Sequence, residues 1–515
     1  MVSQAFKITA FICGTLFAIL FYRSTEVVDS RIDGWSALMI KFVLFKQNAW
    51  HVPHAIDFVV PTTQGVLEKI KLPNSNISVP VHDEDYPDNP AILSWFSSSL
   101  NKHAPAYDDF SEQNAWLSDE DQESYIMHNV GNMLPHSIVN WNDRYSDRAL
   151  ELIAFNGLGQ YRLTKIKRDA NDTSYYAIYT NFMQSLEVRK GFAKYGADAF
   201  FDINGKVVKI IRGNTTYYPY QGREWDVAKF AFRSSLVTLT TAVDHLIGTH
   251  ITAANLVTTA NRELLPPAHP IRRLLKPFTF RSVAINYAAG RALFSTHGML
   301  HRASSLTEKG LQDTFAFGQN SVKYESIPAI IARRSIDTIN LPFDIDALDY
   351  WNVIKSFVDE YIDLYYSQNN ACIADNDVRT FMANMSIPFN TCNDLKEFLT
   401  YIIHVVSGGH NFFGSIAEYI SDPKFMTSAW VEGELSARPS SSIKLSLIMS
   451  VTSFKQPMIT EDFSHILLDD AARDIAHKFT ASLYELGTRI DARNRVRPQP
   501  FESFNPKYMQ MAVSI

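Results

Sequence analysis

Apolar residues recur at helical spacing through most of the second half of the chain. From Glu224 onward this spacing predicts one helix after another. The clearest stripe has spacings of four, four, three and four, and consists of Ile475, Phe479, Leu483, Leu486 and Ile490. Positions three and four apart lie on one face of an α-helix, so we expect this stripe in the core.

A shorter stretch before these helices has the pattern of strands. Three runs rich in aromatic and β-branched residues occupy positions 175–179, 199–203 and 207–211. Asn204-Gly205 separates the last two runs, and this dipeptide is a strong signal for a tight hairpin turn. We therefore predict a mainly α fold, in which one large helical domain over residues 145–515 carries a small β-hairpin or sheet insertion.

The N-terminal part of the chain follows neither pattern. Residues 24–144 mix short apolar stretches, prolines and acidic runs, which predicts an irregular, acidic region with a solvated face. Before it, Lys7 precedes about 15 apolar residues, from Ile8 to Tyr22. This arrangement predicts that residues 1–23 are a signal peptide or a short signal anchor, and a buried or amphipathic helix is the alternative.

Composition and charge narrow the classes of partner. Hydrophobic residues make up 46% and charged residues 20% of the chain, as in ordinary globular proteins. The net charge is −6, from 48 basic and 54 acidic residues, and no stretch is strongly basic. Binding to nucleic acid needs clustered Lys and Arg, so we expect no nucleic-acid partner.

Cysteines and glycosylation motifs indicate in which cellular compartment the protein is expected. Cys13 lies in the apolar N-terminal segment, which leaves Cys372 and Cys392 as the one pair that could form a disulfide. A secreted protein, or one anchored to a membrane surface through its N-terminal segment, is the localisation that we expect. Four N-x-S/T motifs agree with this route, at Asn76, Asn171, Asn214 and Asn384.

Histidine is the commonest metal ligand, and several of the 15 histidines lie in close pairs, three of which we consider. The pairs are His245 with His250, His297 with His301, and His404 with His410. A spacing of four places the second pair on one helix face, as in zinc proteases. That chemistry needs Glu directly after the first histidine, and here the residue is Gly298, so this site is excluded.

The spacing of five between His245 and His250 is unusual for two side chains that act together. In an ordinary α-helix they would diverge by roughly 140°. A local π-bulge would bring them to one metal ion, and such bulges are frequent at functional sites. Two core histidines without a metal are the alternative.

The end of the chain, Met511–Ile515, is uncharged and apolar apart from Ser514. Burial of a terminal Ile contributes on the order of 1.5–3 kcal/mol. It would also bury the α-carboxylate, which then needs a compensating cation, and a metal ion meets that need. A loosely docked tail with its carboxylate in water is the alternative.

Taken together, these residues resemble the lipoxygenases, which are non-haem metal dioxygenases of polyunsaturated fatty acids. The resemblance covers roughly residues 145–515 and depends on the order of several stretches. In chain order they are residues 225–233 leading into His245 and His250, residues 261–277, Ile285-Asn286, Ser407–His410, Arg493-Asn494, Asn505-Pro506 and the end Val513–Ile515.

The resemblance implies that His245, His250, His410 and the carboxylate of Ile515 ligate one non-haem iron, with manganese as the alternative metal. It implies that a metal-bound hydroxide removes a bis-allylic hydrogen from a polyunsaturated fatty acid. Dioxygen then traps the radical as a hydroperoxide, and no side chain is assigned as the catalytic group. A hydroperoxide isomerase or lyase with the same fold, or an inactive lipid-binding relative, is the alternative.

The chain departs from the family pattern at Gly414, where the family usually carries Asn, His or Ser as a weaker ligand. Ser415, Asn411, His404 or a water would then serve, or the position is left open. Residues 24–85 also look too few and too irregular to build the family's N-terminal β-barrel. By position, Ala303 resembles the small residue in contact with substrate that is associated with the stereochemistry of oxygen insertion.

Overall fold

The computed structural model describes residues 65–72, 75–81, 143, 145–167, 172–295, 298–367, 371–420, 424–436 and 457–513. The predicted segment 1–23 and most of the predicted irregular region 24–144 lie outside these residues. Inside that region, strands β1 (Lys69–Lys71) and β2 (Ser78–Pro80) form an antiparallel hairpin beside helix α9. Across the described ranges, every helix is too short or too polar to cross a lipid bilayer.

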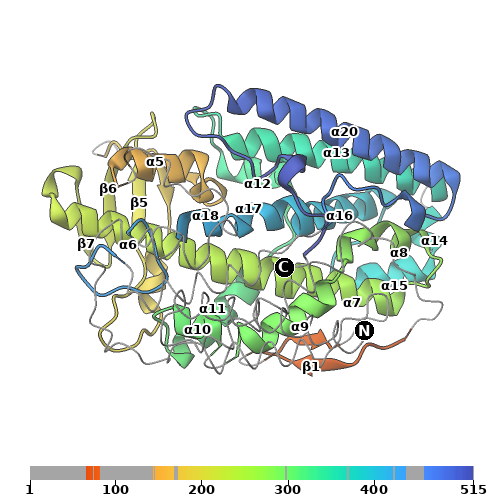
Figure 1. The fold of residues 1–515 in the computed structure, drawn as a ribbon, viewed down its shortest axis with the longest axis horizontal. Coiled ribbons are helices and arrows are strands. Elements are labelled where there is room, and N and C mark those ends of the chain that lie inside the picture. The colour runs from red at the N-terminus through yellow and green to blue at the C-terminus, as the bar shows by residue number, and fades with distance from the viewer. Residues whose placement is uncertain are drawn as a thin grey trace, which may run out of the picture.

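Most of the described chain is helical, and the sheets are small, as predicted (Figure 1). The α- and π-helices are α5 (Asp147–Asn156), α6 (Arg223–Leu239), η6 (Thr240–Ala254), α7 (Asn255–Leu264), α8 (Pro270–Leu275), α9 (Ser282–Ala292), α10 (Met299–Ala303), α11 (Glu308–Ser321), α12 (Ile327–Arg334), α13 (Pro342–Tyr365), α14 (Ala371–Ala374), α15 (Asn376–Asn384), α16 (Cys392–His404), η8 (Val405–Gly409), α17 (His410–Gly414), α18 (Ile416–Ile420) and α20 (Asp470–Asn494). Short 3-10 turns are η3 (Leu158–Tyr161), η4 (Asn181–Ser185), η5 (Pro219–Gln221), η7 (Pro277–Thr279), η9 (Ser464–Ile466) and η10 (Pro506–Tyr508).

The main core lies where α13 packs against α16 and α20 (Figure 1). Asp469 precedes helix α20, and its side chain accepts a hydrogen bond from the backbone N–H of Ala472 and so caps the first turn. All five residues of the predicted α20 stripe are buried in this core. The helical spacing therefore predicted the buried face of α20 correctly.

A five-stranded antiparallel sheet packs near α5 and α6. Its strands follow chain order: β3 (Thr164–Lys165), β4 (Tyr176–Ile178), β5 (Asp198–Phe201), β6 (Val207–Arg212) and β7 (Thr215–Tyr217). The predicted turn joins β5 to β6, and Gly205 has a φ of 78°, a conformation that glycine adopts without strain. The hairpin is thus confirmed, and it belongs to a wider meander.

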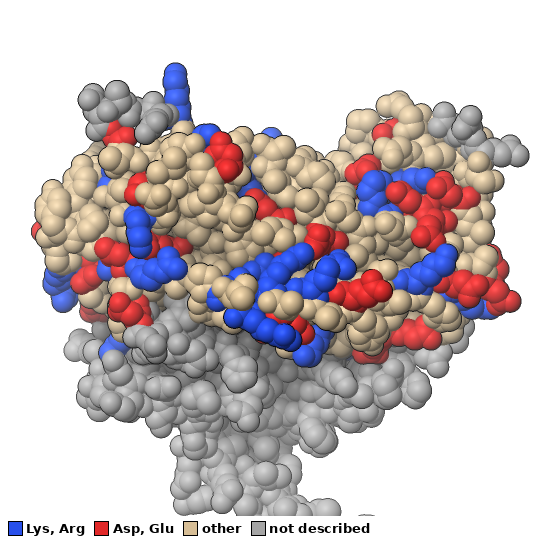
Figure 2. Space-filling model, turned by 90° about the horizontal axis from the view of Figure 1, so that it is seen from above, with Lys and Arg blue, Asp and Glu red and all other residues tan. Residues whose placement is uncertain are grey.

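Ion pairs tie the C-terminal half of α20 to α13. Arg493 and Arg497 both contact the buried carboxylate of Asp346, and Arg493 also contacts Asp349. Figure 2 views this side of the molecule and shows basic and acidic side chains intermingled over it. These arginines are therefore largely compensated by neighbouring carboxylates.

A disulfide joins α14 to α16 through Cys372 and Cys392, the pair that the sequence left available. Their Cα atoms are 5.7 Å apart, within the usual range for disulfides, and Cys372 is fully buried. The bridge closes a loop with a sequence separation of 20 residues around α15.

Replacing both Cys372 and Cys392 by serine is expected to lower the free energy of unfolding by about 3 kcal/mol. The reason is that a loop of this length loses that much chain entropy in the cross-linked unfolded state. Urea unfolding of both proteins with and without dithiothreitol measures the effect. Reductant should destabilise the natural sequence and leave the double variant unchanged; equal sensitivity of the two would contradict the bridge.

Candidate metal centre

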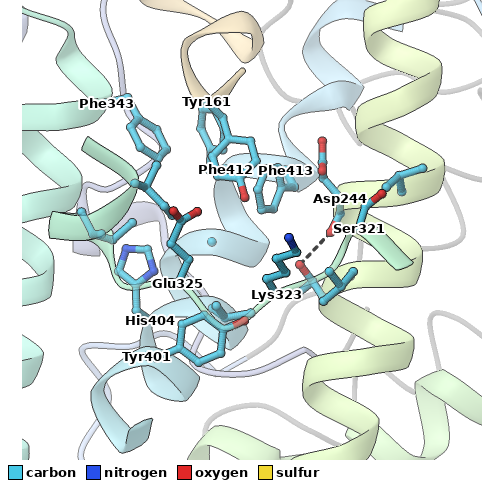
Figure 3. Close-up of a pocket in the computed structure, with 18 of the residues that line it drawn as sticks. Tyr161, Asp244, Ser321, Lys323, Glu325, Phe343, Tyr401, His404, Phe412 and Phe413 are labelled. Carbon is cyan, nitrogen blue, oxygen red and sulfur yellow. Dashed lines mark hydrogen bonds between the residues drawn. The ribbon is translucent and has the colours of Figure 1, made fainter. Parts of the chain in front are cut away.

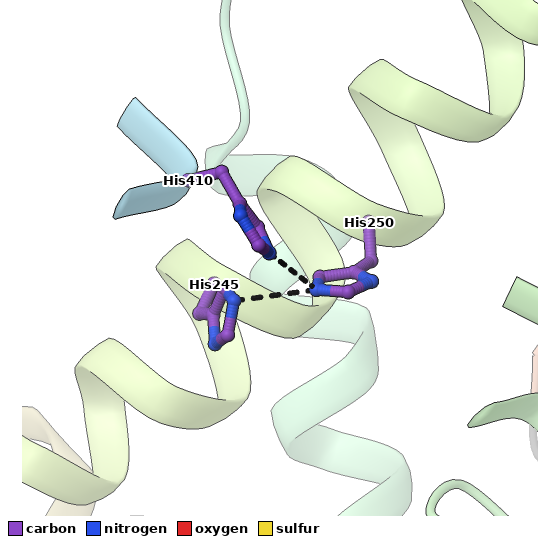
Figure 4. A group of neighbouring side chains, drawn as sticks. All are labelled: His245, His250 and His410. Atoms are coloured by element: carbon purple, nitrogen blue, oxygen red, sulfur yellow. Dashed lines mark hydrogen bonds between the residues drawn. The ribbon is translucent and has the colours of Figure 1, made fainter. Parts of the chain in front are cut away.

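Helix α6 continues without a break into η6, a π-helix of 15 residues, and then into α7. A π turn closes with a hydrogen bond between residues five apart, so such residues lie on nearly the same face. His245 and His250 both belong to η6, and their side chains point to the same side (Figure 4). The local widening predicted from their spacing is present, and it extends over the whole of η6.

A second π segment, η8, positions His410. It lies between α16 and α17, and His410 is the first residue of α17. Gly408 lies in η8, and a Cβ atom there would stand 2.7 Å from the ring of Tyr350 on α13. Only glycine allows this approach, which holds η8 against α13 and brings His410 towards η6.

The three imidazoles meet through their Nε2 atoms (Figure 4). Nε2 of His250 is 3.2 Å from Nε2 of His245 and 3.2 Å from Nε2 of His410. Two nitrogens that each lie about 2.1 Å from one ion are about 3.0 Å apart at right angles and about 3.4 Å apart at the tetrahedral angle. The two Nε2–Nε2 distances fit a single first-row metal ion, and all three ligand nitrogens lie within 4.8 Å of one another.

The protonation of these histidines also suits a metal. His250 and His410 are buried and His245 is half-buried. Burial and the neighbouring imidazoles hold the pKa values of His245 and His250 well below their usual range. The two rings are therefore neutral, with lone pairs available, and nitrogen donors without thiolate favour iron, manganese or zinc over a soft ion.

Asn286 on α9 orients His250. Its Oδ1 is 3.3 Å from Nδ1 of His250, and its Nδ2 donates to the backbone carbonyl of the same residue at 3.0 Å. With the Nδ1–H of His250 donated to Oδ1, the lone pair of Nε2 faces the other imidazoles. The sequence placed Asn286 in a family-like stretch, but it gave no sign of this contact.

Replacing Asn286 by leucine is expected to weaken metal retention about 10- to 100-fold, because His250 loses the acceptor that fixes its tautomer and ring angle. Competition with a chelator, followed by metal analysis, measures the effect. Asn255 is a matched control, because its Nδ2 donates to the carbonyl of Ser78 and not to a histidine. Equal metal retention in the two leucine variants would show that Asn286 has no role in the site.

The chain end approaches the side of α9 that carries Asn286. The Ser282 hydroxyl donates to the carbonyl of Val513 at 2.9 Å, and Val513 is fully buried. Ser282 lies four residues before Asn286 and therefore on the same helix face. The predicted ligand Ile515 lies outside the described residues, and its role stays a prediction.

Gly414 lies directly beside the cluster. A Cβ atom there would stand 3.7 Å from Nε2 of His245, so a longer side chain would reach the imidazoles. The alternatives raised for this position make other contacts: the Asn411 amide donates to the carbonyl of Ser503, and the Ser415 hydroxyl donates to the carbonyl of Phe412. Among the described His, Cys, Asp and Glu residues, the group that could share an ion consists of His245, His250 and His410.

His404, the other alternative, belongs to a separate aromatic environment. Its ring stacks on Phe504, with centroids 5.6 Å apart, and lies beside Tyr350 and Trp351. It is absent from the group of histidines that could share an ion. Burial lowers the pKa of His404 to about 3, so its ring is neutral at ordinary pH.

A phenylalanine in place of His404 is expected to make stability less sensitive to acid. Because the folded-state pKa lies below the unfolded value of about 6.5, His404 favours the folded state above pH 6.5 and loses that contribution as the pH falls towards 3. At pH 5 the loss is about 2 kcal/mol. Urea unfolding at pH 8 and pH 5 measures it, and an equal acid effect in both proteins would contradict the burial of a neutral ring.

Ala303, the predicted substrate contact, is fully buried at the end of α10. It belongs to the same core cluster as Leu236 and Val237. Both of these residues lie on α6, the helix that precedes η6 and its two histidines. The structure thus places Ala303 in the core beside the helix that leads to the site, and its contact with substrate stays a prediction.

Comparisons with known proteins agree with this geometry. Residues 209–414, which contain all three histidines, match the family model described as lipoxygenase. The chain is 24% identical over 328 residues to the hydroperoxide isomerase ALOXE3 of Rattus norvegicus, covering 57% of this chain and 46% of the relative. It is 23% identical over 326 residues to the polyunsaturated fatty acid lipoxygenase ALOX8 of Mus musculus, covering 57% and 48%. The match thus spans about half the length of these curated relatives.

Solved structures show the same fold. The manganese lipoxygenase of Gaeumannomyces graminis superimposes with a TM-score of 0.66 at 12% identity, covering 91% of this chain and 98% of that one. At such low identity the likeness concerns the fold alone. It includes the mainly helical architecture and small sheets predicted from the sequence.

Proposed function

Since the chain belongs to the lipoxygenase family, we propose that it is a metal-dependent dioxygenase of polyunsaturated fatty acids. The reaction converts a cis,cis-1,4-pentadiene and O2 into a conjugated diene that carries a hydroperoxide. One hydrogen leaves the bis-allylic carbon and is returned on the peroxide, so the substrate gains two oxygen atoms. The observation that carries the proposal is the grouping of three imidazole nitrogens within 4.8 Å of one another.

His245, His250 and His410 would hold the metal, which we propose to be iron, with manganese as the alternative. A bound ion of this kind would supply the one-electron oxidation that removal of the weak bis-allylic hydrogen requires. The rest of the work belongs to the chain: η6 and η8 set the positions of the imidazoles, and Asn286 keeps the Nε2 lone pair of His250 turned towards them.

We propose the carboxylate of Ile515 as the fourth protein donor. The path of the tail supports this, because Val513 is buried against Ser282 on the face of α9 that also presents Asn286. A carboxylate brought there needs a positive partner, and the ion provides one. Gly414 leaves its side of His245 without a ligand side chain, which leaves space for a water molecule.

The decisive experiment incubates the purified protein with linoleate and follows the absorbance of the conjugated diene, with iron and manganese measured on the same sample. A rise in diene absorbance together with about one metal ion per chain supports the dioxygenase. A protein with less than about half an equivalent of metal and no diene formation would be a lipid-binding relative without this chemistry.

A hydroperoxide isomerase or lyase is the second proposal, and two observations favour it. Gly414 changes the set of groups around the ion, and one similar protein is a hydroperoxide isomerase. The same assay separates the two activities when it is started with linoleate hydroperoxide. Consumption of hydroperoxide without oxidation of linoleate identifies the isomerase or lyase.

We also propose that the protein is secreted or anchored to a membrane through residues 1–23. The disulfide between Cys372 and Cys392 supports an oxidising compartment. Three of the four glycosylation motifs lie on described residues, and their asparagines, Asn76, Asn214 and Asn384, are all exposed. Expression in eukaryotic cells followed by glycosidase treatment tests this, and a mass unchanged by the enzyme would argue against it.

A further inference from the structure

A cavity away from the histidine cluster is lined in part by helix η6, which also carries His245 and His250. None of the three clustered histidines lines this cavity. We call it the Lys323 pocket. Figure 3 shows residues that line it. Among them are residues of η6, α13, α16 and α17, and residues of the segment that follows α11. Three kinds of side chain line it: charged side chains at its mouth, aromatic side chains along its walls, and one polar side chain in its interior.

The charges around the mouth do not cancel. Asp244 is paired with Arg162 at 2.6 Å, and Glu325 is paired with Arg333 at 2.8 Å. Within the described ranges, Lys323 makes no ion pair, and its amine points into the pocket in Figure 3. The pocket therefore presents one uncompensated cation, which favours an anionic ligand.

The walls beyond the amine are aromatic. Tyr161, Phe412 and Phe413 lie together along one side, and Phe343 packs edge-on against Phe412. This surface suits a chain of methylene groups, because each group that it removes from water favours binding.

His404 provides the polar group inside. It lines the pocket, only 4% of its side chain is exposed, and its Nε2 is buried without a hydrogen-bond partner. A buried polar atom without a hydrogen-bond partner is unfavourable, so a ligand that supplies the partner binds more tightly. The ring does not bind the proposed metal, because it lies outside the histidine cluster.

The volume limits the length of the ligand. The cavity measures about 100 Å³. A single water molecule needs about 10–15 Å³ on this measure, so the pocket has room for roughly seven to ten atoms of that size. A saturated chain of about eight carbons is within this limit.

We propose that the Lys323 pocket binds a medium-chain hydroxy fatty acid. The carboxylate lies at Lys323, the methylene chain lies along the aromatic walls, and the hydroxyl group forms a hydrogen bond with Nε2 of His404. This site is separate from the proposed metal centre, and its occupancy does not depend on dioxygenase activity.

Calorimetric titration of the purified full chain with 8-hydroxyoctanoate, octanoate and 1-octanol tests the proposal. We expect 8-hydroxyoctanoate to bind about fivefold more tightly than octanoate, because one net hydrogen bond is worth that factor. Lys323→Glu should weaken the binding of both acids at least tenfold, and it should change the affinity for 1-octanol by no more than about twofold. His404→Phe should abolish the advantage of the hydroxylated acid.

Lys190→Glu is the matched control, because Lys190 is an exposed lysine that does not line the pocket. It should leave the affinity for all three compounds unchanged. If no acid binds saturably, or if Lys323→Glu and Lys190→Glu bind the acids alike, the pocket is not the site. Equal affinities for octanoate and 8-hydroxyoctanoate in the natural sequence would overturn the assignment of His404. None of these results depends on diene formation, so the proposed dioxygenase can fail separately.

Discussion

Replacing His250 by alanine is expected to leave the purified protein without bound metal and without dioxygenase activity. Nε2 of His250 is the central atom of the cluster, 3.2 Å from each of the other two nitrogens. Without it, the site keeps one imidazole from η6, one from α17 and the proposed carboxylate of Ile515, too few to hold a divalent ion against a chelator. We expect metal affinity to fall by more than the roughly 100-fold that loss of an outer partner can cause. Metal analysis after dialysis against a chelator, and diene formation with linoleate, measure the two effects.

His404→Phe is the control for this experiment. His404 is also a buried histidine near His410 in sequence, but its ring lies among Tyr350, Trp351 and Phe504. Its replacement should leave the metal content unchanged. Near-ultraviolet circular dichroism of both variants establishes that each is folded. A folded His250→Ala protein with a full equivalent of metal would refute the site.

Adding Gly-Ser after Ile515 is expected to reduce metal affinity at least tenfold and activity to a similar degree. Val513 is already buried, with its carbonyl bound by Ser282, so the chain has entered the core two residues before Ile515. Further residues would move the proposed carboxylate away from the imidazoles and replace it with a neutral peptide group. Chelator competition and the linoleate assay measure both effects.

Ile515→Val is the matched control for the extension, because it keeps the carboxylate at the same position and removes only one methylene group. Its metal affinity should stay within about twofold of the natural sequence. Full metal retention by the extended protein would show that the carboxylate of Ile515 is not a ligand.

Regular spacing predicted the elements that depend on local sequence. The stripe on α20 lies in the core, and Asn204-Gly205 forms the turn between β5 and β6. Neighbouring residues determine these features, so their pattern is visible along the chain. The two additional edge strands, β3 and β7, are only two and three residues long, too short for a periodic signal.

The metal centre was predictable in its ligands and less so in its surroundings. The five-residue spacing of His245 and His250 indicated a widened helix, and the structure places both in a π-helix. The role of Asn286 depends on α9 lying beside η6, and a contact between distant segments leaves no local pattern. The same holds for the unpaired nitrogen of His404, because its isolation results from packing among aromatic rings.

The π-helix makes the site sensitive to the number of residues in η6 more than to their identity. Substitutions between His245 and His250 change side chains, but they leave unchanged the number of backbone residues that brings the two rings together. Removing a single residue there would leave a spacing of four, which suits an ordinary α-helix, and would rotate everything from His250 onward relative to α6 by about 100°. Because Asn286, Ser282 and the chain end follow His250 and would move with it, the deletion would separate His245 from the other two histidines.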